Sequence, residues 1–434
     1  MSAHRVRRAS VLVALALSVF AVPGPARADT VTDWNQIATD ALIRDGGQGA
    51  ISIANLAMVH GAVYDAVNAI DGGHEPYLVA PPARSWYSQD AAAATAAYRV
   101  LVDSRPPVVP AAQQPALATR LRPLYDAALA KLPPGAAKDG GIATGNAAAD
   151  AMIAARTADG RFGPFRFTAG SEPGTWRPEL PDFISDPGAW LKDVKPFLIA
   201  DASQFRSLPP NPLTSARYAK DFDEVKTLGA ADSTTRTADQ TAAAQFWGLA
   251  NAPGTWSDIF RKLAVARHGS VADNARLFAM LYLTGADALI TTWTDKARYS
   301  RWRPITAIHE AGHDGNPATR PDAHWMPLVP TPPYPDHPAG LPALSGAVVR
   351  TLQAFYGTDE ATFGTTNAAK VPITRTYTRF SQAIEEIVNA RVWSGIHFRL
   401  ADEQGAAIGE AVARFTEDRF ARRCPPHRAR SARS

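Results

Sequence analysis

Apolar residues recur at spacings of three and four along most of the chain, which is the period of an α-helix with one buried face. In the first half the pattern is clearest at Leu56, Val59, Val63, Val67 and Ile70. Alanine-rich segments with a similar pattern cover 88–101, 114–132 and 136–158. No segment shows the strong alternation of a half-buried strand, so the sequence predicts an all-α fold.

The second half continues this pattern after a long irregular stretch. Helices are expected over 216–228, 237–249, 256–267, 271–296 and 348–355. The longest, from Val271 to about Lys296, has a broad apolar stripe formed by Leu277, Met280, Leu281, Leu283, Ala286 and Leu289. This pattern predicts a core helix whose last turn carries Lys296.

Two proline-rich segments interrupt the helices. The first, 164–212, contains Trp176, Phe183 and Trp190, and because these aromatic rings favour burial, we predict an ordered excursion over the surface. The second spans 304–342. We therefore predict two adjoining helical bundles with long Pro-rich loops: an N-terminal bundle with the excursion over 29–212 and a C-terminal bundle over 213–421.

The composition fits such a fold. The chain has 434 residues, 46% of them hydrophobic, and a net charge of +4. This modest charge is not gathered into one basic stripe, which argues against a nucleic-acid partner. A basic tail over 422–434 is expected to be disordered. The single cysteine, Cys424, lies in that tail and excludes an intramolecular disulfide.

The N-terminus resembles an export signal. Arg5, Arg7 and Arg8 precede an apolar run over 11–22, and Ala26-Arg27-Ala28 supplies a small-x-small cleavage site. Because the run is too short to span a bilayer comfortably, we expect a signal peptide over 1–28 and a secreted or extracytoplasmic protein without stable membrane insertion. The residues around Arg7-Arg8 fit a twin-arginine signal poorly, so the general secretory route is preferred.

Two basic blocks frame the C-terminal third. One runs from Lys296 to Arg303-Pro304, and the other from Arg391 to His397. Arginine forks and a lysine ammonium neutralise an oxyanion such as phosphate or vanadate through charge-assisted hydrogen bonds. A neutral imidazole can then bond the central atom. The spacing therefore points to an oxyanion pocket.

Arg391 and His397 cannot both face one ligand from a straight helix, because six residues place them on different faces. The segment 376–396 has Phe380, Ile384, Ile387 and Val388 at helical spacing. We expect this helix to end near Gly395, which would release His397 into a turn.

These blocks resemble the vanadium-dependent haloperoxidases and the related acid phosphatases of the type-2 phosphatidic acid phosphatase superfamily. The family pattern is a lysine, six residues and Arg-Pro; a Pro-Ser-x-His block; and an arginine followed after five residues by a histidine. Lys296, Arg303-Pro304, Arg391 and His397 match in identity and spacing. Segments 56–68, 314–319 and 395–398 are also similar, as is Trp293, so the resemblance covers most of the mature chain.

The middle block departs from the family pattern. The segment 334–341 aligns without gaps to the family's run and places Ala339 at the serine and Leu341 at the histidine. In the family this histidine is the general acid or base, and leucine cannot transfer a proton. His337 lies four residues earlier and is a substitute to consider, although Pro338 favours an extended chain before it.

The resemblance implies an exported haloperoxidase-like enzyme that oxidises halide with hydrogen peroxide. His397 would anchor vanadate, and Lys296, Arg303, Arg391 and the Gly340 amide would hold its oxygens. One alternative is an acid phosphatase in which His397 attacks a phosphate ester. Another is an oxyanion-binding descendant without turnover, because Leu341 replaces the proton donor.

A competing motif is His309-Glu310-Ala311-Gly312-His313, which satisfies the H-E-x-x-H pattern of zinc metalloproteases. That chemistry requires two histidines one turn apart on a continuous helix. Gly312 and the turn-forming residues 314–317 interrupt such a helix, so we favour a loop in which the histidines have no metal-binding role. His324 is the third ligand that the zinc interpretation would need.

Overall fold

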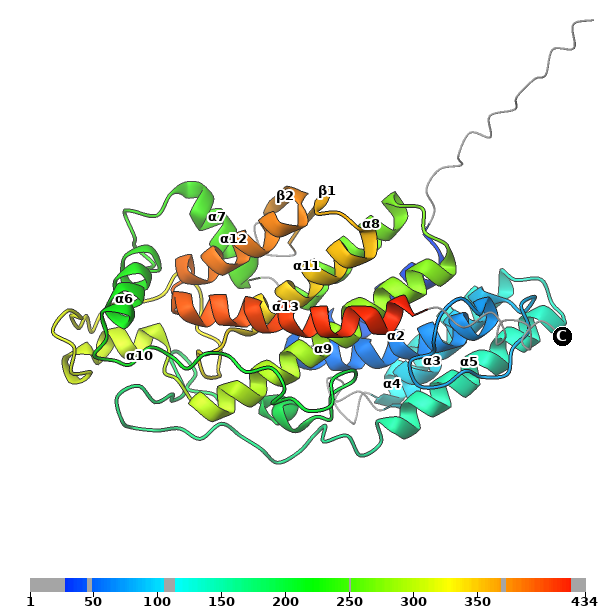
Figure 1. The fold of residues 1–434 in the computed structure, drawn as a ribbon, viewed down its shortest axis with the longest axis horizontal. Helices are drawn as coiled ribbons and strands as arrows, with labels where there is room; N and C mark the ends of the chain where they lie inside the picture. Colours follow the sequence, from blue (N-terminus) through cyan, green and yellow to red (C-terminus); the bar gives the residue numbers. More distant parts are fainter. Residues whose placement is uncertain (1–27, 45–48, 105–113, 250, 368–371, 423–434) are drawn as a thin grey trace, which may run out of the picture.

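The computed structural model describes residues 28–44, 49–104, 114–249, 251–367 and 372–422. The predicted signal peptide and most of the predicted tail, including Cys424, lie outside them. The described chain is helical almost throughout (Figure 1). Its α-helices are α1 (Thr30–Thr39), α2 (Gly49–Asp71), α3 (Gln89–Asp103), α4 (Gln114–Ala130), α5 (Ala136–Ala155), α6 (Ala216–Leu228), α7 (Ala238–Leu249), α8 (Ala252–Ala266), α9 (Val271–Tyr299), α10 (Pro304–His309), α11 (Gly340–Tyr356), α12 (Phe380–Trp393) and α13 (Arg399–Ala421).

The long helix α9 joins the two halves of the molecule. It packs against α2 and also against α11 and α13, so it lies between the early and late helices (Figure 1). One continuous cluster of buried apolar side chains extends from Val31 in α1 to Phe420 in α13. The prediction that α9 is a core helix is confirmed, because its apolar stripe from Leu277 to Leu289 is buried. The α-helical fold class predicted from the sequence is confirmed.

Four expectations need correction. A two-stranded antiparallel hairpin, β1 (Glu360–Thr366) and β2 (Thr374–Arg379), stands where no strand was expected. Its inward positions include Ala361 and Thr365, which carry little hydrophobic signal. As a result α12 begins at Phe380 rather than at 376. Helices α1, α10 and α13 were also not predicted, and α11 begins at Gly340 rather than at 348. Helix α13 is rich in alanine and charged residues, which weakens its apolar period.

The proline-rich excursion is ordered and packs beside the end of α9. A short 3₁₀ helix, η3 (Ala189–Asp193), lies within it. Trp176 and Trp190 are buried as expected, but Phe183 is 61% exposed, so the burial prediction was wrong for that ring. The Trp176 amide donates to the Ser300 carbonyl at 2.7 Å, which ties the excursion to the residue that follows α9.

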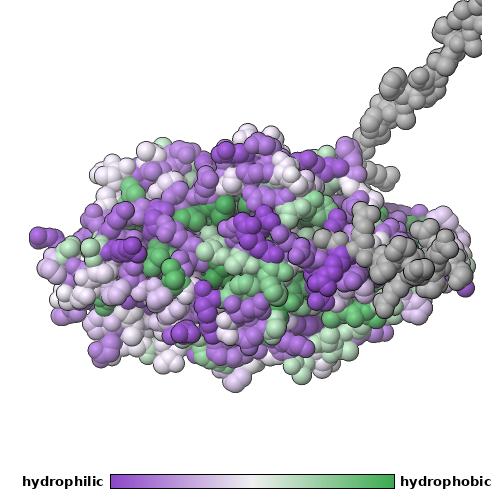
Figure 2. All heavy atoms as spheres, in the orientation of Figure 1, coloured by the Kyte–Doolittle hydropathy of each residue, from purple (hydrophilic) through white to green (hydrophobic). Residues whose placement is uncertain are grey.

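The surface is mostly hydrophilic, as expected for a protein whose apolar core is enclosed. Hydrophilic residues cover most of the face shown in Figure 2, and apolar residues form separate patches between them. Among the described helices, only α2 is long and apolar enough to cross a membrane, and 94% of its most apolar window is buried in the fold. It is therefore accounted for as a core helix.

Candidate functional site

The end of α9 delivers Lys296 into the interior. Its side chain is fully buried in the last turn of the helix, and Ser300 ends the helix in a left-handed conformation. The ammonium donates hydrogen bonds to the carbonyls of Pro335 (2.6 Å) and Asp336 (2.9 Å) and lies 4.9 Å from the centre of the Tyr334 ring. Burial, reinforced by the nearby Arg303 charge, lowers the Lys296 pKa well below its usual value.

Arg303 stands immediately before α10, where the extended chain turns into the helix at Pro304. Its fully buried guanidinium donates from Nε to the Tyr334 carbonyl at 2.7 Å and from Nη1 to the Ile396 carbonyl at 2.7 Å. Its third nitrogen, Nη2, has no hydrogen-bond partner. One strong donor is therefore left open inside the protein, an arrangement that usually has a functional reason.

His397 follows the end of α12, as the sequence predicted. The helix stops at Trp393, and Gly395 adopts φ +81°, which favours glycine. A Cβ at Gly395 would lie 2.4 Å from the Gly229 carbonyl oxygen, so close backbone approach also requires glycine here. This turn brings the His397 Nε2 to within 3.1 Å of Arg303 Nη1.

Asp336 holds the other side of the imidazole. Its Oδ1 lies 2.7 Å from His397 Nδ1, and both side chains are 1% exposed. A proton on Nδ1 that is donated to this carboxylate makes Nε2 the acceptor, which in the structure faces the Arg303 Nη1 donor at 3.1 Å. Burial and three neighbouring cations, Arg303 foremost, lower the His397 pKa well below its usual value, so the ring is neutral. Burial raises the pKa of Asp336 to about 7.

Arg391 reaches the same region from α12. Its Nη1 donates to the Trp247 carbonyl at 3.1 Å, whereas its buried Nε has no partner. Arg391 and Lys296 are close enough that the guanidinium charge contributes to the lowered Lys296 pKa. The structure therefore brings Lys296, Arg303, Arg391 and His397 together from four separate segments.

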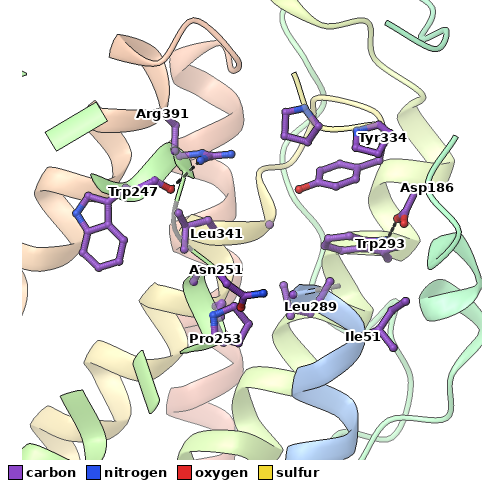
Figure 3. A pocket seen from close by; sticks show the side chains of 18 of the residues that line it. Ile51, Asp186, Trp247, Asn251, Pro253, Leu289, Trp293, Tyr334, Leu341 and Arg391 are labelled. Carbon is purple, nitrogen blue, oxygen red and sulfur yellow. Dashed lines mark hydrogen bonds between the residues drawn. The ribbon is translucent and has the colours of Figure 1, made fainter. Parts of the chain in front are cut away.

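Gly340 begins α11, whose N-cap residue Ala339 supplies no capping side chain. A helix N-terminus offers free amide donors and a partial positive charge, which favour an anion. A Cβ at Gly340 would lie 2.8 Å from the Trp293 ring, so this close approach requires glycine. Gly340, Leu341 and Arg391 line one cavity of about 440 Å³ together with Trp293 and Tyr334 (Figure 3).

His337 does not stand in for the missing family histidine in this arrangement. Its Nε2 lies 2.8 Å from the Leu208 carbonyl, and its ring meets the Tyr299 ring edge-on. Burial lowers the His337 pKa to about 4.

The zinc interpretation finds no support in the described residues. His309 is the last residue of α10, and His313 falls in a separate 3₁₀ turn, η4 (Ala311–His313), so the motif does not lie on one helix. His309 is instead engaged with the Trp325 carbonyl at 2.7 Å. Within the described part of the chain, no group of three or more His, Cys, Asp or Glu side chains could hold a metal ion.

Two acidic residues were missed by sequence reasoning. Asp336 lay inside the aligned middle block but matched no family position that was considered. Asp402, in the first turn of α13, is fully buried, and neither carboxyl oxygen has a hydrogen-bond partner. Burial raises its pKa well above the usual value, against the opposing charge of Arg391. Its position five residues after His397 was the only available signal.

The C-terminal part of the chain is similar in sequence to known proteins. Residues 276–424 match the family model of the VCPO second helical-bundle domain. The vanadium chloroperoxidase of Curvularia inaequalis is 26% identical over 187 residues, which are 36% of this chain and 30% of that protein. The chain thus matches less than a third of the length of this curated relative.

Solved structures extend the likeness to nearly the whole fold. A bacterial vanadium-dependent iodoperoxidase superposes with a TM-score of 0.74 at 21% identity, covering 90% of this chain and 96% of that one. The holo-type bacterial vanadium-dependent chloroperoxidase gives 0.66 at 17% identity, covering 92% and 94%. These matches confirm the resemblance inferred from the sequence blocks, and at such identities the structures speak for the fold alone.

Proposed function

Residues 276–424 belong to the family of the VCPO second helical-bundle domain, and from this premise we propose that the chain is an exported, vanadate-binding, haloperoxidase-like enzyme. In this proposal it uses hydrogen peroxide to oxidise halide. The observation that carries the proposal is the convergence of His397 Nε2 and Arg303 Nη1, 3.1 Å apart in a fully buried site. A ligand that bonds Nε2 would replace this hydrogen bond and would meet the Arg303 guanidinium beside the imidazole.

The residues present fit a vanadate group. Asp336 accepts from Nδ1 and so makes Nε2 the acceptor nitrogen of His397, while Arg303 Nη2 and Arg391 Nε are buried donors without partners. Lys296, Arg303 and Arg391 supply the charge that a multiply charged oxyanion needs. Bound vanadate would supply the Lewis-acid centre at which peroxide is activated for halide oxidation.

The chain's own residues account for binding better than for proton transfer. The cationic side chains and the first amides of α11 can hold oxyanion oxygens, and the buried position of the site excludes bulk water from them. Leu341 offers no proton where the family has a histidine. This specific replacement supports a second candidate, an oxyanion-binding protein with little or no turnover.

Calorimetric titration of the purified chain with orthovanadate tests the proposal. We expect binding that is lost in His397→Ala and kept in His324→Ala, a matched change at an exposed histidine outside the site. Sulfate serves as a control for charge alone, because a site that requires the imidazole should favour vanadate. Equal binding by the two histidine variants would contradict the assignment.

If vanadate binds, peroxide with bromide and then a phosphate ester distinguish the candidates. Halide oxidation supports the haloperoxidase. Ester hydrolysis supports the phosphatase that uses His397 as the nucleophile. Tight binding without either reaction supports the non-turnover protein.

A further inference from the structure

The cavity beside the oxyanion site has walls of two kinds. Its volume of about 440 Å³ is in the range of small-molecule pockets. Apolar side chains line it from two helices, with Leu289 and Trp293 on α9 and Leu341 on α11, and Figure 3 shows Leu341 on the same side as Arg391. The guanidinium of Arg391 extends into the space, and Figure 3 shows it across the cavity from Tyr334 and Trp293.

The charges around this cavity favour an anion. Arg391 is 5% exposed and its Nε has no partner, so a cationic donor remains available at the inner end. The carboxyl of Asp186 also lines the cavity, but its oxygens already accept hydrogen bonds from the Gly188 amide (2.8 Å) and the Trp293 indole (3.0 Å). Burial raises the Asp186 pKa.

Leu341 makes the wall next to the charged end apolar. At this position the family resemblance places a histidine, which would present a polar ring to the same space. A leucine beside an open guanidinium suits a ligand that combines an acid group with a hydrocarbon body. The cavity opens toward Leu249 and Asn251, which are both exposed, so such a molecule has a route from solvent.

We infer that this cavity binds a ring-containing organic oxyanion, with the acid group at Arg391 and the α11 N-terminus and the ring between Trp293 and Leu341. This inference rests on the proposed oxyanion site and names the ligand class that the neighbouring cavity admits. The acid group receives charge-assisted hydrogen bonds, whereas the ring gains from burial against apolar walls. A small inorganic oxyanion uses only the first of these contributions.

A pair of phosphonates tests the inference. Methylphosphonate and 1-naphthylphosphonate carry the same acid group and differ in the apolar body, and neither contains a hydrolysable ester bond. We expect 1-naphthylphosphonate to bind at least about tenfold more tightly to the full chain, because the ring buries apolar surface. It should also compete with orthovanadate in the same calorimeter.

The variant Leu341→Asn should reduce the ratio of the two affinities by about threefold or more, since it replaces an apolar wall with an amide. Leu124→Asn is the matched control at an exposed leucine in α4 and should leave the ratio unchanged. If Leu341→Asn lowers the melting temperature markedly, Leu341→Ala removes the contact without adding a polar group and replaces it.

The outcomes separate this inference from the proposed function. Vanadate binding with equal affinities for the two phosphonates overturns the organic ligand and leaves the oxyanion site intact. A tight naphthyl ligand whose preference is unchanged by both Leu341 variants binds elsewhere and also overturns it. Failure of vanadate and both phosphonates to bind overturns the inference together with the proposed function.

Discussion

Two buried groups of charged side chains in this protein differ in how closely a carboxylate approaches their cations: Asp159 contacts both of its arginines, whereas Arg303 lies 4.0 Å from Asp336. In the N-terminal half, Arg156 and Arg161 both form ion pairs with Asp159, at 2.8 and 2.9 Å. The remaining donors of Arg156 reach the carbonyls of Lys195 and Pro196. In the C-terminal half, Arg303 and Arg391 each keep a nitrogen without a partner.

The difference separates a structural group from a binding site. A buried charge is tolerated when ion pairs and hydrogen bonds replace its lost hydration. In the N-terminal group the Asp159 carboxylate lies 2.8 Å from Arg156 and 2.9 Å from Arg161, so both cations have an opposite charge in contact, although Arg156 Nε and Asp159 Oδ2 lack a hydrogen-bond partner. Around His397, protein atoms do not replace all of the lost hydration. Arg303 Nη2, Arg391 Nε and both carboxyl oxygens of Asp402 have no hydrogen-bond partner. The open donors are the ones that an oxyanion would engage.

The largest expected effect concerns the proton donor that is missing from the site around His397, where Leu341 replaces the family's histidine. In the proposed enzyme, Leu341→His should raise turnover of bromide oxidation or phosphate-ester hydrolysis by about 10²- to 10⁴-fold, the usual contribution of a general acid. Steady-state rates at equal vanadate saturation measure the gain, with Leu341→Gln as a polar control that transfers no proton. An equal gain in both variants would mean that polarity, and not acid catalysis, is responsible.

The next effect concerns the paired group. Arg156→Met should lower the free energy of unfolding by about 3 to 5 kcal/mol, the usual cost of breaking a buried ion pair. Urea denaturation gives this value directly. Vanadate affinity under native conditions should be unchanged, because Arg156 lies in the other group. A variant with unchanged stability would show that the pairing is not what stabilises this region.

The fold was predictable from the sequence where apolar residues repeat strongly, as in α2 and α9. The hairpin of β1 and β2 was not, because each strand has only one large inward-facing side chain, Phe363 and Tyr377, while the other inward positions of β1 hold Ala361 and Thr365. Asp336 shows the corresponding limit for the site. The spacing of Lys296, Arg303, Arg391 and His397 indicated an oxyanion pocket, but the hydrogen bond between Asp336 and His397 depends on a tertiary approach across 61 residues.

Arg391→Met is the counterpart of Arg156→Met in the open group. Here we expect unfolding stability to stay the same or rise, since an incompletely paired buried charge is replaced by a similar apolar volume. Vanadate affinity should fall by about 10- to 100-fold, because charge-assisted hydrogen bonds are lost. Calorimetry and urea denaturation on the same preparation report both quantities. A loss of stability as large as that of Arg156→Met would remove the distinction between the two groups.

The smallest expected effect tests whether Asp336 acts as a positioning residue within the open group. Asp336→Asn keeps the side-chain size but removes the charge that holds the proton on His397 Nδ1, so the imidazole can exchange tautomers. We expect vanadate affinity to fall by about tenfold, the lower range for loss of such a carboxylate partner. Nitrogen-15 NMR of the histidine ring reports the tautomer independently of activity. If Asp336 only packs against the ring, Asp336→Asn should lower the stability and leave the tautomer of His397 unchanged. If Asp336 positions the ring, the variant should contain both tautomers. Vanadate affinity should then fall in proportion to the share of rings that carry the proton on Nε2.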